Sequence, residues 1–170
     1  MADSFSLDVD KWIDAFEDGA EETVRTTVIK LWSAVIKATP VDDGRARAGW
    51  FASGRNESAR LPGGVDKSKD GAVTALNAAG VVQKLQDWSV FTLTNNLPYI
   101  EVIEYGRYPD PVKLGTRVNQ TGSRQNPIKP IYEKMSKSGY SKQAPSGMVR
   151  VNIKRFNRLL ELEARRRLPK

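Results

Sequence analysis

The sequence predicts an α+β protein in which a long N-terminal helix and a C-terminal helix pack on a small, mostly antiparallel sheet, with a long irregular arm. Three observations predict it: apolar residues recur at helical spacing near both ends, a β-branched and aromatic run lies mid-chain, and a proline-rich polar stretch follows that run. With 170 residues, 39% of them apolar, the chain suits one compact domain over residues 1–170.

The first helix is predicted over residues 8–38, because apolar residues recur there at spacings of three and four. They form one stripe: Val9, Trp12, Ile13, Phe16, Ala20, Val24, Val28, Leu31 and Val35. Acidic residues crowd the first turns and Pro40 ends the helix. A helix of about 45 Å is longer than a domain of this size needs. Trp32 and Ile36 fall outside the stripe, so a second face contacts either this same chain or a neighbouring subunit.

Residues 39–106 are predicted to supply the sheet and short helices. The polar, glycine-rich residues 54–70 are typical of an exposed loop, and the alanine-rich run 72–88 favours a short helix. The run 88–94 (WSVFTLT) predicts a strand buried on both sides. Residues 97–106 (LPYIEVIEYG) favour a short helix from their Pro and Gly positions, with a strand as the alternative.

Residues 107–146 hold five prolines and eight bases against two acids, which indicates an extended arm without a core of its own. The C-terminal helix is predicted over residues 147–168. Its apolar face consists of Val149, Ile153, Phe156, Leu160 and Ala164, and its far end is strongly basic.

Charge is distributed unevenly along the chain, whose net charge is +7. Residues 1–37 carry eight acids and four bases, whereas residues 106–170 carry sixteen bases and four acids. This polarity fits a basic face for nucleic acid, acidic and basic ends that meet between identical subunits, or simply a solvated surface.

Cysteine and histidine are both absent, which removes disulfides, thiolate nucleophiles, imidazole bases and most transition-metal ligand sets. We therefore expect no enzyme, no cofactor and no metal. A carboxylate-dependent nuclease or hydrolase around Asp42, Asp43, Glu101 and Glu104 is the catalytic alternative. No apolar run approaches the roughly 20 residues that cross a bilayer, and the acidic amino terminus is unlike a signal peptide, so we expect neither membrane insertion nor secretion by that route.

The stretch TPVDDGRARAGW, which follows the first helix, concentrates charge at a predicted turn. Asp42 or Asp43 can cap the next short helix by accepting a backbone N–H, and Gly44 eases the turn. Arg45 and Arg47 can pair with those carboxylates or with a partner chain. We interpret the stretch as an architectural joint and not as a chemical site.

Three segments stand in a characteristic order: TPVDDGRARAGW, TNNLPYIEVIEYG and APSGMVRVNIKRF. Together they resemble the tail-component family of long-tailed bacteriophages, small neck or tail-completion proteins whose members read close to TPVDTGRLRASW, NNLPYAxxIEYG and APxGMVRVTxxxF. The resemblance covers residues 8–160 in pieces. The chain departs from it at Asp43, where threonine is common, and within YIEVIEYG, which keeps Tyr99, Glu104, Tyr105 and Gly106.

The resemblance implies an α+β protein that forms a ring, expected to be a hexamer, in the neck of a virion assembled in the host cytoplasm. Its implied partners are the head-closure or connector proteins on one side and the tail terminator or tail tube protein on the other. The residues we predict at subunit or partner interfaces are Trp32, Ile36, Asp42, Asp43, Arg45, Arg47, Tyr99, Glu104 and Tyr105.

The alternative function is nucleic-acid binding that is indifferent to sequence, including contact with genomic DNA inside such a ring. Arg165, Arg166 and Arg167 on the last helix could neutralise phosphates. No sequence-reading module accompanies them, since the chain has neither a zinc-finger pattern nor an RNA-recognition motif.

Overall fold

The computed structural model describes residues 2–106, 140–141 and 143–169. Most of the predicted arm 107–146 lies outside these residues. The first helix, α1, spans Ala2–Ala38 and is about 55 Å long. The predicted start at residue 8 is therefore too late, because residues 2–7 contain no proline or glycine that would stop the helix. Among the described helices, none is long and apolar enough to cross a bilayer.

The small antiparallel sheet is confirmed and has two strands, β1 (Trp50–Ser53) and β2 (Thr92–Asn95), with Trp50 paired to Asn95. The predicted strand 88–94 is confirmed only in its second half, and its predicted burial on both sides is wrong. Its first half lies outside β2, and the residues of β2 are only half-buried. A local turn explains why the strand starts later than predicted. The Asp87 carboxylate accepts hydrogen bonds from the backbone N–H of Ser89 at 2.9 Å and from the Ser89 hydroxyl at 2.5 Å.

Short helices complete the fold: α2 (Arg45–Ala48), the 3₁₀ turn η1 (Lys69–Gly71), α3 (Ala72–Lys84), α4 (Ile100–Tyr105), α5 (Val149–Ile153) and α6 (Phe156–Arg167). Helix α4 confirms the helical prediction for residues 97–106 over the strand. The single helix predicted over 147–168 is two helices. The break follows from Asn152, whose carbonyl accepts the N–H of Arg155 at 3.0 Å and whose side-chain amide binds the Met148 carbonyl at 2.6 Å.

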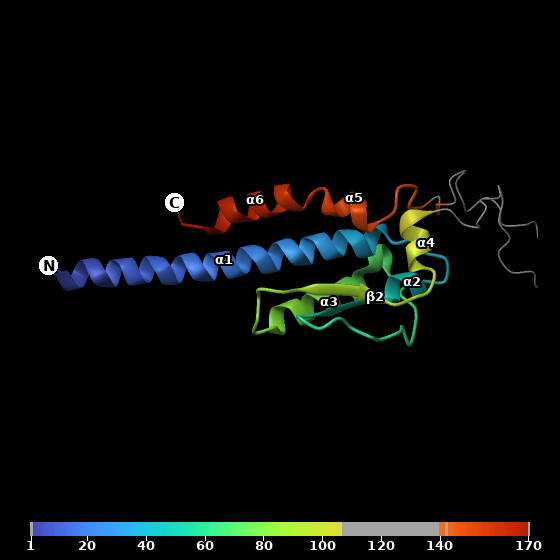
Figure 1. Ribbon diagram of the computed structural model, residues 1–170, viewed down its shortest axis with the longest axis horizontal. Helices are drawn as coiled ribbons and strands as arrows, with labels where there is room; N and C mark the ends of the chain where they lie inside the picture. Colours follow the sequence, from blue (N-terminus) through green and yellow to red (C-terminus); the bar gives the residue numbers. More distant parts are fainter. Residues whose placement is uncertain (1, 107–139, 142, 170) are drawn as a thin grey trace, which may run out of the picture.

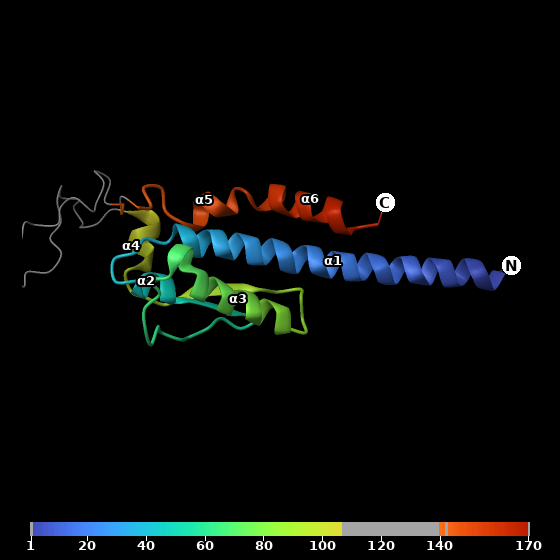
Figure 2. The same cartoon turned by 180° about the vertical axis from the view of Figure 1, so that it is seen from behind.

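Helix α1 is the middle layer of the molecule. Figures 1 and 2 show α5 and α6 along one side of it and α3 with the sheet along the other. The core forms around its C-terminal half from Val28, Trp32, Val35, Ile36, Trp50, Ala78, Val82 and Met148. Trp32 is 7% exposed and Ile36 is fully buried. They therefore contact this same chain, which was the alternative to a neighbouring subunit, and we withdraw both from the predicted interface.

Candidate interaction surfaces

The three resembling segments meet at the C-terminal end of α1 and form one joint. Asn95 Nδ2 donates to the carbonyl of Ala46 at 2.9 Å, which ties the second segment to the first. Gln143, next to the third segment, holds the backbone of Val41 through its amide, with distances of 2.9 Å to the Val41 nitrogen and 2.8 Å to its oxygen. The prediction of an architectural joint thus extends to all three segments.

Arg47 lies at the centre of this joint and is 9% exposed. Its guanidinium donates to the carbonyls of Thr39 at 3.2 Å and Ser68 at 3.2 Å. Thr39 also holds Trp50, whose indole N–H donates to the threonine hydroxyl at 2.8 Å. Because Arg47 binds backbone carbonyls that end α1 and flank α3, it is not available to a partner chain, and its predicted interface role is withdrawn.

Glu104 joins the second segment to the third and is 6% exposed. Its carboxylate accepts the backbone N–H groups of Met148, Val149 and Arg150 at 2.7, 2.8 and 3.0 Å, and Arg150 Nε at 2.9 Å. Burial by itself raises the pKa of Glu104, but the hydrogen bonds from these four donors outweigh it and hold the pKa below 4.5. Glu104 therefore fixes the start of α5, and its interface role is withdrawn with that of Arg47.

The other predicted interface residues are exposed. Asp43 Oδ1 accepts the N–H of Arg45 at 2.8 Å, so an aspartate does stabilise the turn into α2, although Gly44 occupies the capping position. Tyr99 lies near both residues. Partial burial and, as a smaller effect, the negative charge of Asp43 raise the pKa of Tyr99, whereas the positive charge of Arg45 lowers it. Asp42 and Tyr105 are exposed as well. No group of three carboxylates that could hold a metal occurs in the described part of the chain.

The amino-terminal part of α1 projects past α3, the sheet and α6 (Figure 1), and we call residues 2–18 the overhang. At its inner end, Phe16 lines a hollow together with Trp88. Helix α6 reaches α1 no farther than Gly19, where a Cβ would lie 2.8 Å from the Arg167 carbonyl oxygen. Beyond this point the apolar stripe faces solvent, with Trp12 52%, Ile13 43% and Phe16 40% exposed. Trp12 and Phe16 stack at 5.4 Å. The sequence predicted this stripe and the excess length of the helix, but not where along the helix the stripe becomes exposed.

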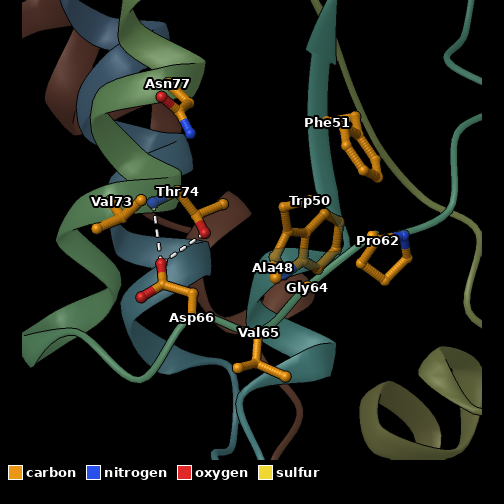
Figure 3. A pocket seen from close by; sticks show the side chains of 11 residues that line it. Ala48, Trp50, Phe51, Pro62, Gly64, Val65, Asp66, Val73, Thr74 and Asn77 are labelled. Carbon is orange, nitrogen blue, oxygen red and sulfur yellow. Dashed lines mark hydrogen bonds between the residues drawn. The ribbon is translucent and has the colours of Figure 1, made fainter.

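A second exposed apolar surface lies on the opposite part of the molecule, and we call it the α3 groove (Figure 3). It is a hollow of about 210 Å³ between α3, β1 and the loop 62–66, and Trp50, Phe51, Pro62, Val65 and Val73 line it. Two of its lining side chains, Val65 and Val73, are strongly exposed, each at 56%.

Asp66 holds the groove loop to the first turn of α3, as the dashed lines in Figure 3 show. Its carboxylate accepts the N–H and hydroxyl of Thr74 at 2.9 and 2.5 Å, and the N–H of Ser68 at 2.9 Å. Burial raises the pKa of Asp66, but the hydrogen bonds from Ser68 and Thr74 prevail and lower it to about 2. These hydrogen bonds therefore fix the position of the loop and with it the shape of the groove.

The basic end of α6 meets the acidic half of α1 within the same chain. Glu163, 2% exposed, forms ion pairs with Lys30 and Arg167, and Arg167 Nε reaches Glu22 at 3.1 Å. Arg167 is thus a structural residue, which corrects its assignment as DNA-facing. Arg166 lies 3.6 Å from Glu163 but stays exposed, and Arg165 is exposed too. Part of the charge polarity is therefore satisfied inside one molecule and not between subunits.

Comparisons with known proteins add no family to this description. No protein-family model matches the chain, and no curated protein or solved structure matches it at a significant level.

Proposed function

We propose that the protein is a structural component of a bacteriophage neck, where copies of it form a ring that joins heads to tails. The exposed aromatic stripe of the overhang carries this proposal. Large apolar side chains gathered on one projecting helix are typical of an interaction surface, since soluble monomers rarely expose such patches. The proposed neighbours are a connector or head-closure protein and a tail terminator or tail tube protein.

The joint supports the same proposal in a different way. The three segments that resemble the phage family hold the body of the protein together through Arg47, Asn95 and Glu104. A resemblance in these structural residues supports a shared fold. Docking to partners would then use surfaces outside the joint. The overhang and the α3 groove are two such surfaces, and the exposed cluster of Asp43, Arg45 and Tyr99 is a third.

Replacing Trp12 and Phe16 together by aspartate is expected to weaken self-association by at least about 100-fold, because each removes a desolvated aromatic anchor. Both side chains face solvent in the lone chain, so the thermal midpoint should stay within a few degrees of the wild type. Sedimentation velocity across a concentration series measures the association. Leu162→Asp, a 42% exposed position on α6, is the matched control and should associate normally. A wild-type protein that stays monomeric at high concentration contradicts the proposal.

The exposed bases of α6 and of the break before it support nucleic-acid binding as a second candidate function. They are Lys154, Arg155, Arg158, Arg165 and Arg166. This function predicts affinity for duplex DNA of any sequence that weakens steeply as salt rises.

The Arg165→Ala, Arg166→Ala double variant should lower the slope of log affinity against log salt by about 2, one for each phosphate that is no longer neutralised. Fluorescence anisotropy with a labelled duplex measures the slope. Arg167→Ala is the comparison variant, because its side chain pairs with Glu22 and Glu163 and its removal should lower stability more than DNA affinity. An unchanged slope in the double variant would exclude this use of α6.

A further inference from the structure

We infer that the overhang of one copy docks into the α3 groove of a second copy. This contact is heterologous: one surface of a molecule meets a different surface of the next, and repetition closes into a ring when the rotation between copies allows it. The inference rests on the proposed oligomer and names the contact that builds it.

The size and lining of the groove favour a protein side chain as its occupant. Its volume of about 210 Å³ is smaller than the roughly 300–1,000 Å³ of small-molecule sites. Its lining is mostly apolar, and two of the lining side chains, Val65 and Val73, are 56% exposed. An aromatic ring such as that of Trp12 or Phe16 has the matching chemistry, since aromatic residues are the commonest anchors of protein interfaces.

Charge complements this apolar match. Residues 9–18 of the overhang hold four acids and one base. The polar loop 54–70, of which the groove loop 62–66 is a part, presents Arg60, Lys67 and Lys69 to solvent. Of the acids in the same loop, Asp66 is buried against Thr74, Asp70 pairs with Lys37 at 3.1 Å, and Glu57 is exposed. An acidic helix approaching a basic rim gains favourable electrostatics along with apolar burial.

The occupant must come from another molecule. Helix α1 is continuous from Ala2 to Ala38, and Figures 1 and 2 show its amino terminus at the end of the molecule opposite α2. The overhang therefore cannot bend back to the groove beside α2 and β1 of its own chain. The basic outer face of α5 and α6 is a poorer receptor, because its exposed apolar residues Ile153 and Leu162 lie on different helices on either side of the break.

Disulfide trapping tests this contact directly, because the chain contains no cysteine. An Ile13→Cys chain is mixed with a Val73→Cys chain and oxidised, and the control mixture pairs Ile13→Cys with Leu162→Cys. These three positions are 43%, 56% and 42% exposed, so none of the changes disturbs the core. A disulfide requires Cα atoms within about 7 Å. We expect at least about tenfold more mixed disulfide with Val73→Cys than with Leu162→Cys, because a docked overhang holds its thiol within this distance of position 73 and not of position 162.

Sedimentation of the wild-type chain and of the cysteine variants separates the two proposals. An oligomer that gives no excess of the Ile13–Val73 disulfide overturns the inference and leaves the ring intact. A product dominated by Ile13–Ile13 disulfides also overturns it, in favour of overhangs that pair with each other. A wild-type chain that sediments as a monomer overturns both the ring and the contact.

Charge reversal gives a second readout with no cross-link. The overhang variant Asp14→Lys, Glu17→Lys and the groove variant Lys67→Glu, Lys69→Glu should each associate about tenfold or more weakly than wild type, because like charges then face each other. An equimolar mixture should recover association, since every overhang then meets a groove rim of opposite charge. If the mixture associates no better than its components, the overhang does not dock at this rim.

Discussion

Replacing Glu104 by glutamine is expected to lower the free energy of unfolding by about 3 kcal/mol, because it removes one partner of a buried charge-assisted network. The carboxylate accepts three backbone N–H groups at the start of α5 and the Arg150 Nε atom. A glutamine side chain keeps only one acceptor oxygen, and its NH₂ group would face N–H donors that a carboxylate oxygen accepts in the wild type. Urea unfolding followed by tryptophan fluorescence measures the decrease in stability.

The effect of Glu104 should also depend on pH, with a sign fixed by its lowered pKa. Because the folded pKa lies below the usual 4.5, the carboxylate stabilises the fold fully above about pH 4.5. That contribution disappears as the pH falls through the folded pKa. The stability gap between wild type and Glu104→Gln should therefore narrow in acid. Glu101→Gln, an exposed position on the same helix, is the control and should change stability by less than about 0.5 kcal/mol. Equal decreases in the two variants would contradict the joint.

The sequence predicted those elements whose signal is local. Helical periodicity identified α1, and the pattern of Pro98 and Gly106 identified α4 against a strand. The turn into α2 was predictable too, because Asp43 meets a backbone N–H only two residues away. In each case the residues that determine the structure are neighbours along the chain.

Two failed predictions, the start of the strand and the unbroken C-terminal helix, follow from local turns at Asp87 and Asn152. The failed interface predictions involve partners far away in sequence. Glu104 and Arg47 were predicted at an interface, yet Glu104 binds the backbone N–H of Met148 and Arg47 binds the carbonyl of Ser68. No single-sequence pattern shows which backbone groups will lie beside a charge. The burial of Arg47 and Glu104 is therefore a property of the assembled joint.

The apolar stripe of α1 is another feature that the local sequence pattern predicts only in part. Its period is correct along the whole helix, but the period cannot say what covers it. Val28 and Val35 are buried in the chain's own core, whereas Trp12 and Phe16 on the same stripe are exposed. The body of the protein forms around the C-terminal half of α1, so Trp12 stays half exposed on the other half, while Phe16 lines a hollow with Trp88. The part of the stripe that the core leaves exposed is the reason for proposing contact with a second copy of the chain.

Replacing Gly44 by alanine is expected to lower the free energy of unfolding by about 2–4 kcal/mol, from the strain of a left-handed backbone and from overpacking. Gly44 has φ +91°, and a Cβ there would lie 2.6 Å from the backbone oxygen of Asp66. The clash is with main chain that cannot move freely, because the N–H of Asp66 donates to the Gly44 carbonyl at 3.0 Å and its carboxylate binds Thr74. Gly80→Ala is the control: its Cβ would meet no described atom within 4 Å, and inside α3 it should raise stability by about 0.5–1 kcal/mol. If Gly44→Ala lowers the free energy of unfolding by no more than the roughly 1–2 kcal/mol of backbone strain, Gly44 does not pack tightly against the groove loop. The structure of the joint is then independent of the groove.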